Sequence, residues 1–292
     1  MTDKTKGRLA EIFGCRREAV KYEYALKNGM TNDSFLFSVA GRQGRYIARC
    51  PGAGTGALID RRQEHSVYEA LRGLSICDDI VHLCRETGLK VTRFWEGART
   101  CDKDSPEDVA ACMGLLRDFH GRRLSVAHAF CPFERIGYYE GLLGGRPSAY
   151  ADYADTKARV MGLREFIGGA AGPSALSHID AVPSNFVFLP DGGLRLIDWE
   201  YAAMQDPHID IAMFSVYAMY GKEQIDGLAG AYFRDGPPDG AMGKIYAYVA
   251  VCGLLWSNWC EFKNLHGVPL GGYARRQYRY AREFCRMPGG GA

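Results

Sequence analysis

The sequence predicts an α+β protein in which a small antiparallel sheet precedes a mainly helical part. Before residue 95, short apolar runs come in pairs that are separated by glycine-containing turns, which is typical of β-hairpins. After Glu96 the apolar residues recur at helical spacing instead. A chain of 292 residues is long enough for two domains or lobes. We therefore expect an N-terminal lobe over residues 1–95 and a C-terminal lobe over residues 96–292.

In the N-terminal lobe, the apolar runs predict two hairpins with a helix between them. Within residues 35–39, Phe35, Phe37 and Val39 lie on one face of an expected strand. Residues 45–49 follow after a turn that contains two glycines. Residues 59–71 carry apolar side chains at loosely helical spacing. Residues 80–84 and 89–94 form the second pair of runs, about a Thr-Gly turn. This part of the chain is therefore expected to be a small sheet with one helix.

In the C-terminal lobe, a helix is expected to begin at Ser105, because this capping serine is followed by Pro106 in the first turn. Another helix is expected near residues 151–166. The helical pattern stops for one more hairpin between Leu176 and Tyr201 and resumes from Ile209. The C-terminal lobe is thus helical except for this hairpin.

Composition and charge exclude several classes of function. The formal net charge is +2, which argues against a nucleic-acid-binding protein. The first 20 residues are polar and lack the apolar core of a signal peptide. The longest nearly apolar stretch, residues 245–256, is too short for a membrane span of about 20 residues, so no membrane insertion is expected. The ten cysteines include no CxxC pair, and free thiols in a reducing, cytoplasmic environment are expected.

The hairpin expected between residues 186 and 197 is the most informative part of the sequence. Two apolar runs flank Pro190-Asp191-Gly192-Gly193, and an Asp-Gly centre is a strong hairpin signal. A turn centred between Asp191 and Gly192 places Asn185 opposite Asp198, with Cβ atoms about 4.5–5.5 Å apart. Asp180 lies on the loop just before the hairpin. These three side chains carry oxygen acceptors, which suit a hard, partly hydrated cation such as Mg²⁺.

The same stretch resembles the catalytic and metal-binding motifs of the choline kinase and aminoglycoside phosphotransferase superfamily, whose fold is protein-kinase-like. The matching segments are HIDAVPSN at 178–185, IDWEYA at 197–202 and DPHIDIA at 206–212. They are most similar to those of bacterial choline kinases of the lic type. The segments GMTN at 29–32, YIARCPG at 46–52 and IDRRQE at 59–64 resemble the front of these kinases in matching order.

The resemblance implies an ATP- and Mg²⁺-dependent phosphotransferase that acts on a small alcohol. Asp180 would accept the alcohol proton, and Asn185 and Asp198 would hold Mg²⁺ against the ATP phosphates. Asp210 would brace the catalytic loop from a helix, although an aspartate at this position also suits a helix N-cap.

The N-terminal lobe would be the nucleotide-binding lobe, and the C-terminal lobe would hold the catalytic and substrate-binding residues. Arg49 would pair with the phosphates and be oriented by Glu64. The backbone of a glycine-containing loop would cover the phosphates, since glycine permits close approach. The residues of this loop are Gly29, Met30, Thr31 and Asn32.

The resemblance also implies a substrate with a cationic head group, choline first. A quaternary ammonium has no hydrogen to donate, so aromatic faces and carboxylates recognise it. Trp256 and Trp259 share one helical face and resemble the family's choline-pocket tryptophans, although aromatic residues at this spacing are also common in cores. Tyr217 stands where many choline kinases carry a glutamate near the cation. Tyr217 could replace that carboxylate by a cation–π contact, or Glu200 and Glu261 could supply the missing negative charge.

The sequence leaves three alternatives to an active choline kinase. Ethanolamine, another amino alcohol or an aminoglycoside are alternative substrates. The segment GAGTGA at 52–57 matches a dinucleotide-binding pattern, but the preceding strand lies in an expected antiparallel hairpin rather than a parallel sheet. A catalytically inactive kinase-like module would usually lack one of Asp180, Asn185 and Asp198, and all three are present. The sequence gives no indication of the oligomeric state.

Overall fold

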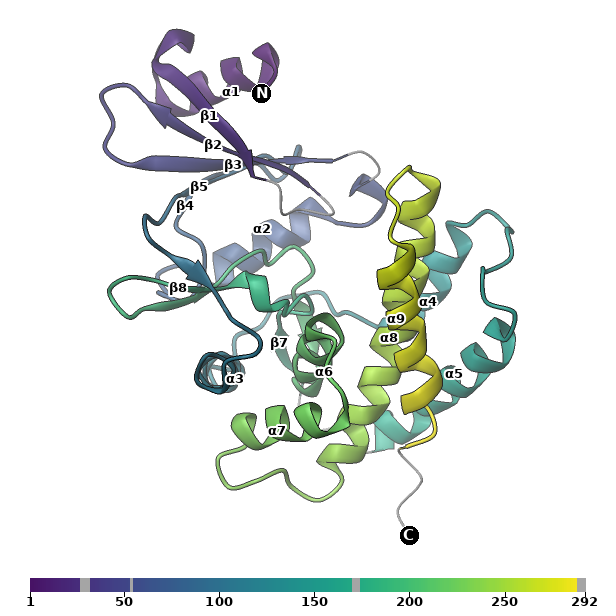
Figure 1. Cartoon of the computed structure of the whole chain (residues 1–292). Coiled ribbons are helices and arrows are strands. Elements are labelled where there is room, and N and C mark those ends of the chain that lie inside the picture. The colour runs from purple at the N-terminus through teal and green to yellow at the C-terminus, as the bar shows by residue number, and fades with distance from the viewer. Residues whose placement is uncertain (27–31, 53–54, 170–173, 288–292) are drawn as a thin grey trace. The chain divides into compact units, whose positions relative to one another are not determined.

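A computed structural model describes residues 1–26, 32–52, 55–169 and 174–287 (Figure 1). The chain divides into two compact units, and neither is continuous in sequence. The first unit comprises Met1–Arg99 and Val187–Glu200, and the second comprises Thr100–Phe186 and Tyr201–Ala292. The segment that carries Asp198 therefore belongs with the N-terminal sheet, although it comes late in the sequence.

The first unit is built on a five-stranded antiparallel sheet (Figure 1). Both hairpins predicted in this part of the sequence are confirmed. The edge strand β1 was not predicted, because five of its seven residues are exposed and it lacks an apolar run. In spatial order the strands are β1 (Val20–Leu26), β2 (Asn32–Val39), β3 (Arg45–Pro51), β5 (Lys90–Arg93) and β4 (Ile80–Leu83).

Helix α1 (Asp3–Phe13) supplies the core of this unit and was also missed from the sequence. The Thr2 hydroxyl caps its N-terminus by accepting from the Thr5 N–H at 3.2 Å. Leu9 and Phe13, one turn apart, pack on a cluster of buried sheet residues that includes Phe37 and Val91. The first half of the helix is polar apart from Gly7, so no apolar spacing marked its start.

The antiparallel sheet excludes the dinucleotide-binding reading of residues 52–57. Strand β3, which precedes this segment, pairs antiparallel with both β2 and β5. A dinucleotide-binding unit requires a parallel strand followed by a crossover helix. The helices η1 (Arg17–Ala19) and η2 (Thr55–Ala57) are single 3₁₀ turns.

Helix α2 (Arg61–Ala70) begins at Asp60, whose carboxylate accepts from the Arg62 N–H at 2.9 Å and the Gln63 N–H at 3.3 Å. The helix buries Val67 and Tyr68 as expected for its apolar face, but it also buries Glu64. A carboxylate is stable in such a place only when it is paired and hydrogen-bonded.

The hairpin of β8 (Phe186–Phe188) and β9 (Leu194–Leu196) forms as predicted, but its register differs by one residue. The Leu189 N–H donates to the Gly193 carbonyl at 2.7 Å, so the turn is centred on Asp191 and has a three-residue loop. Gly192 has φ = 85°, the left-handed conformation that a three-residue loop needs at this position. The sequence prediction assumed a two-residue turn, which is the commoner choice for an Asp-Gly pair.

The second unit is mainly helical, as predicted. A short antiparallel ladder of β7 (Ala175–Ser177) and β10 (Ala203–Gln205) interrupts the helices. Ser105 caps α3 as expected, since its hydroxyl accepts from the Asp108 N–H at 3.3 Å. The helices are α3 (Pro106–His120), α4 (Pro132–Gly141), α5 (Tyr153–Gly169), the 3₁₀ turn η3 (Pro183–Asn185), α6 (His208–Ala218), α7 (Lys222–Tyr232), α8 (Ala241–Leu265) and α9 (Gly271–Phe284). The two-residue strand β6 (Arg99–Thr100) lies at the boundary between the units.

Helix α8 is the centre of the second unit and packs against α4, α5, α6 and α9 (Figure 1). It is apolar around most of its circumference, which identifies a buried helix. In the described parts of the chain, no helix combines the length and the apolar character that crossing a bilayer requires. Helices α8 and α9 pack closely at Gly253, where a Cβ atom would lie 2.6 Å from the Gln277 carbonyl oxygen.

We expect Gly253→Ala to destabilise the protein, because the added methyl group meets backbone atoms that cannot move independently of α9. Overpacking of this kind costs about 1–3 kcal/mol of unfolding free energy. Gly227→Ala in α7 is the matched control, since a Cβ atom there meets nothing within 4 Å and alanine favours helix. Thermal unfolding should show a lower midpoint for Gly253→Ala and an unchanged or higher one for Gly227→Ala. Equal midpoints for both variants would contradict the close packing.

Candidate active site

In the first unit, Arg49 is the centre of a buried group of carboxylates. Arg49 lies on β3, and its guanidinium pairs with Glu64 from α2. Its Nη1 atom also lies 2.5 Å from Asp198 Oδ1 and 3.0 Å from Glu200 Oε2. The predicted pairing of Arg49 with Glu64 is therefore present, and the strand, the helix and the segment after β9 each contribute to the group.

Arg61 and Asn32 complete this arrangement. Arg61 Nη1 lies 3.0 Å from both Glu64 Oε2 and Glu200 Oε2, and Arg61 Nη2 donates to Asn32 Oδ1 at 3.1 Å. Asn32 Nδ2 in turn donates to Glu200 Oε2 at 2.9 Å. The other residues predicted for the phosphate loop, Gly29, Met30 and Thr31, lie outside the described residues.

Burial makes the charged side chains of this group unfavourable unless they are paired. The side chains of Arg49, Glu64 and Glu200 are at most 5% exposed, whereas that of Asp198 is 30% exposed. Burial raises the pKa of the Glu200 carboxyl, the negative charge of Asp198 raises it further, and Arg49 opposes both effects. Asp198 is thus the accessible carboxylate of an otherwise buried network.

The oxygen atoms of this group suit a hard cation. One carboxylate oxygen each from Glu64, Asp198 and Glu200 lie within 4.8 Å of one another. Oxygen ligands are those that Mg²⁺ prefers, and it keeps several of its waters when only one or two carboxylates bind it. Asp198 is the most exposed of the three carboxylates and is therefore the member best able to turn to a metal.

In the second unit, the loop after β7 holds Asp180 through a network of backbone contacts. The carboxylate of Asp210 accepts from the N–H groups of His178 and Ile179, each at 2.7 Å. Asp210 lies inside α6, whose N-cap is Pro207, so the bracing role is confirmed and the capping alternative is wrong. Ile179 has φ = 65°, an uncommon conformation for a β-branched residue. The contacts with Asp210 therefore stabilise a loop conformation that is unfavourable by itself.

Two further buried side chains hold Asp210 in place. His120 Nε2 lies 3.0 Å from Asp210 Oδ2, and His120 Nδ1 lies 2.8 Å from the Tyr232 hydroxyl. His120 comes from α3 and Tyr232 from α7, so three helices meet at the brace. No role was predicted for His120, because nothing local in the sequence distinguishes a bracing histidine from a core one.

Asp180 itself contacts Tyr217 and Asn185. The Tyr217 hydroxyl donates to Asp180 Oδ1 at 2.5 Å. Asn185 Nδ2 donates to the Asp180 carbonyl at 3.0 Å and approaches Asp180 Oδ2 at 3.5 Å. Burial raises the pKa of Tyr217 well above its usual value, and the charge of Asp180 adds to this shift. The phenol therefore stays protonated and remains a donor to the carboxylate.

The ring of Tyr217 joins Asp180 to an aromatic cluster. Its centroid lies 5.5 Å from that of Trp256, which also meets Tyr201 edge-on at 5.8 Å and Trp259 edge-on at 5.6 Å. The Trp256 Nε1 atom donates to Met213 Sδ at 3.0 Å, which fixes the indole. The two tryptophans are buried, and Trp256 lies one aromatic ring away from Asp180.

Trp259 and the C-terminal tyrosines have other partners. Lys263 Nζ lies 5.8 Å from the centroid of the Trp259 ring, so a cation of the chain itself already lies over that ring. Tyr278 stacks on Tyr150 at 3.7 Å, and the Tyr280 hydroxyl donates to the Tyr220 carbonyl. Tyr278 and Tyr280 therefore pack α9 rather than line the aromatic cluster.

The predicted site residues thus fall into two groups. The first group also includes Arg61, Tyr68, Asp78 and Lys90, which were not predicted. Isolated charged residues in short elements usually mark a solvated surface, and a tyrosine on a helix usually belongs to the core. Glu200 was named as a possible source of negative charge near the substrate. Its carboxylate pairs with Arg49 and Arg61 of its own unit. The first unit brings together Asn32, Arg49, Glu64, Asp198 and Glu200, and the second unit brings together Asp180, Asn185, Tyr217, Trp256 and Trp259.

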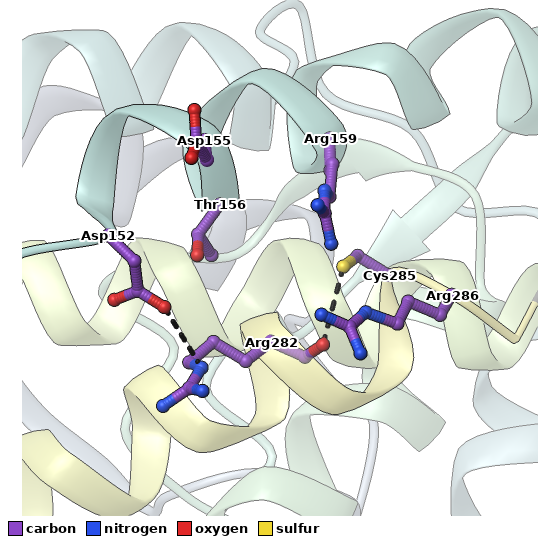
Figure 2. A pocket seen from close by; sticks show the side chains of 7 residues that line it. All are labelled: Asp152, Asp155, Thr156, Arg159, Arg282, Cys285 and Arg286. Carbon is purple, nitrogen blue, oxygen red and sulfur yellow. Dashed lines mark hydrogen bonds and ion pairs between the residues drawn. The ribbon is translucent and has the colours of Figure 1, made fainter.

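A small hollow elsewhere in the second unit does not belong to either group (Figure 2). Its volume is about 80 Å³. Both carboxylate oxygens of Asp152 are engaged there by α9, through the Tyr278 hydroxyl at 2.9 Å and Arg282 Nε at 3.1 Å. These contacts fasten α9 to α5. The lining residues are Asp152, Asp155, Thr156, Arg159, Arg282, Cys285 and Arg286.

A small antiparallel-sheet lobe with a buried Arg–Glu pair, followed by a mainly helical lobe with a braced aspartate, defines a two-lobed protein-kinase-like fold. The chain belongs to the phosphotransferase enzyme family, whose model matches residues 25–248. It is therefore a phosphotransferase.

Several relatives are similar over most of their length. Protein LicA of Haemophilus influenzae is 25% identical over 263 residues, which cover 85% of this chain and 76% of the relative. The crystal structure of choline kinase LicA from Streptococcus pneumoniae has a TM-score of 0.83 and 27% identity and covers 97% of each chain. A structure of LicA in complex with AMP has a TM-score of 0.84 and 27% identity and covers 99% of this chain and 100% of the other.

Proposed function

We propose that this chain is a choline kinase, which transfers the γ-phosphoryl group of ATP to the hydroxyl group of choline. One observation carries the proposal: the hydroxyl of Tyr217 binds the Asp180 carboxylate while its ring packs on Trp256. A proton acceptor and an aromatic surface are therefore adjacent. Choline offers a hydroxyl group and a quaternary ammonium separated by a short carbon chain, which suits this juxtaposition. The similarity to choline kinase LicA supports the same substrate.

The other predicted roles complete the proposal. Arg49, oriented by Glu64, would pair with the ATP phosphates, and Asn32 would adjoin the phosphate loop. Asp198 and Asn185 would bind Mg²⁺, which neutralises charge on the phosphates when it is bound. The donor set fits the metal, because Asp198 is the exposed carboxylate of its group and Asn185 offers an amide oxygen.

Asp180 would act on the substrate hydroxyl. Phosphoryl transfer needs positioning and charge stabilisation more than covalent participation of the protein, so the carboxylate orients the hydroxyl and accepts its proton. The hydrogen bond from Tyr217 fixes the orientation of that carboxylate. The Asp210 brace fixes the backbone from which the carboxylate projects.

Ethanolamine and aminoglycosides are the alternative substrates. A primary ammonium donates hydrogen bonds and therefore calls for acceptors, whereas a quaternary ammonium needs only an aromatic surface and a diffuse negative charge. Tyr217 occupies the position at which a glutamate was expected, and Glu200 is engaged by Arg49 and Arg61. Glu261 accepts from the Ser148 hydroxyl and the Ala149 N–H. This distribution of carboxylates favours choline over a substrate with primary amines.

The reaction would take place in the cytoplasm, where ATP is available. None of the ten cysteines is paired in a disulfide in the described parts of the chain. Free thiols are typical of proteins in a reducing compartment.

Release of ADP from ATP and Mg²⁺ in the presence of choline, ethanolamine or kanamycin tests the proposed function. We expect turnover with choline to exceed that with the other two alcohols and to stop when EDTA removes the metal. Asp180→Ala serves as the blank for contaminating kinases. Turnover with ethanolamine or kanamycin but not with choline would replace the substrate and keep the phosphotransferase. Turnover in EDTA would contradict the metal requirement.

A further inference from the structure

Lys90 is a buried cation that the proposed function does not use. It begins β5 and lies directly opposite Arg49 of β3 in the antiparallel register, so the two side chains share one face of the sheet. Each side chain is only 5% exposed. Like charges directly opposite on a sheet are destabilising, and a buried charge needs a partner. Two adjacent buried cations therefore require carboxylates close by.

The partners of Lys90 differ from those of Arg49 in all but one case. Lys90 Nζ lies 3.6 Å from Asp78 Oδ1 and donates to the Tyr68 hydroxyl at 2.9 Å. The shared partner is Asp198, whose Oδ1 atom lies 3.4 Å from Lys90 Nζ and 2.5 Å from Arg49 Nη1. Arg49 also pairs with Glu64 and Glu200, whereas Lys90 is held by Tyr68 and Asp78.

Asp78 connects the same network to the backbone of Asp198. Asp78 Oδ2 accepts from the Tyr68 hydroxyl at 2.7 Å and from the Asp198 N–H at 3.3 Å. Lys90, Tyr68 and Asp78 thus hold Asp198 at two points, its amide and its carboxylate. Asp198 has φ = 69°, a left-handed conformation that is uncommon for residues other than glycine, although aspartate adopts it more readily than most.

The charged side chains around Arg49 and Lys90 carry a net negative charge, which a bound cation would neutralise. Arg49, Arg61 and Lys90 contribute three positive charges, and Glu64, Asp78, Asp198 and Glu200 contribute four negative charges when ionised. Lys90 thus reduces the excess of negative charges from two to one. Without it, the four carboxylates would share the two arginines and repel one another.

We propose that Lys90 is a positioning residue that holds the carboxylate and backbone of Asp198 in place for Mg²⁺, and that Tyr68 and Asp78 hold Lys90. This inference rests on the proposed role of Asp198 as a metal ligand. It assigns Lys90 no contact with the substrate, so its removal should change the metal requirement and leave choline binding unchanged.

The decisive measurement is the Mg²⁺ dependence of choline phosphorylation by Lys90→Met, which keeps the length of the side chain and removes its charge. We expect the Mg²⁺ concentration for half-maximal rate to rise about tenfold, while the KM for choline stays within about twofold. That tenfold shift corresponds to about 1.4 kcal/mol, just below the range for a hydrogen bond to a charged group. Lys90→Arg, which keeps the charge, should restore most of the wild-type requirement.

Tyr68→Phe keeps the test decisive if Lys90→Met does not fold, because it removes one hydroxyl and leaves all charges in place. It should raise the Mg²⁺ requirement about threefold. An unchanged requirement in a folded Lys90→Met, or in Tyr68→Phe where Lys90→Met fails to fold, would overturn the inference. A loss of thermal stability alone would show a structural role only.

Thermal stabilisation by ADP, measured with and without Mg²⁺, separates this inference from the proposed function. The readout needs no turnover, so it applies even if the wild-type protein phosphorylates none of the alcohols tested. We expect Mg²⁺ to increase the stabilisation by ADP in the wild type and to do so less in Lys90→Met. An equal effect of Mg²⁺ in both proteins would overturn the role of Lys90, whichever substrate the enzyme uses.

Discussion

Asp180→Asn should lower kcat for choline phosphorylation by about 10²–10⁴-fold, because the amide cannot accept the hydroxyl proton. The substitution keeps the size of the side chain, and an amide oxygen can still accept the hydrogen bond from Tyr217. Nucleotide binding should be retained, since no predicted nucleotide contact involves Asp180. Steady-state kinetics gives the change in kcat, and thermal stabilisation by ADP reports on nucleotide binding.

Asp239→Asn is the control for this substitution, since it makes the same chemical change at an exposed aspartate of the same unit. It should leave kcat within about twofold of the wild-type value. A folded Asp180→Asn that binds ADP and retains more than about a tenth of wild-type kcat would contradict the assignment of Asp180 as the base. Loss of ADP binding along with activity would instead point to a structural defect.

Trp256→Leu should raise the KM for choline by about tenfold or more, because it replaces an aromatic face by an apolar side chain without one. A cation–π contact in a desolvated site is worth about 2 kcal/mol, and 1.4 kcal/mol corresponds to a factor of ten. Trp256→Phe keeps an aromatic face and should recover part of the affinity. Both variants create a cavity in α8, so their effects on stability should be similar in direction.

The neutral choline analogue 3,3-dimethylbutanol distinguishes a lost cation–π contact from a misshapen pocket. It has nearly the same shape as choline but no charge. Trp256→Leu should weaken choline much more than this analogue, whereas a change in pocket shape would weaken both equally. Equal changes in KM for the two alcohols would show that other side chains recognise the ammonium group.

Local signals in the sequence predicted much of the fold. The two N-terminal hairpins, the capped helix α3 and the helical second unit all follow from turn residues, capping residues and apolar spacing. Helix α1 and strand β1 did not, because the burial of Leu9 and Phe13 depends on a sheet that is built from residues later in the chain. The register of the β8–β9 hairpin depended on a choice between two turn types that the same Asp-Gly pair allows.

The candidate site shows the same division between local and tertiary information. Asp180, Asn185 and Asp198 stand in motifs with clear family resemblance, so the sequence identifies them. Lys90 does not, because a lysine at the start of a short strand is usually exposed, and its burial follows from Asp78 and Asp198, which lie far from each other in sequence. Tyr217 was recognised as a departure from the family pattern, but its hydrogen bond to Asp180 required the fold.

The convergence of two backbone amides on Asp210 has a consequence for the temperature dependence of the reaction. Conformations such as that of Ile179 carry a strain of about 1–3 kcal/mol, which the contacts to the buried Asp210 carboxylate offset when the chain folds. The loop then needs no further ordering in each catalytic cycle. The activation entropy of the chemical step should accordingly reflect the ordering of the substrate alone and remain small once choline is bound.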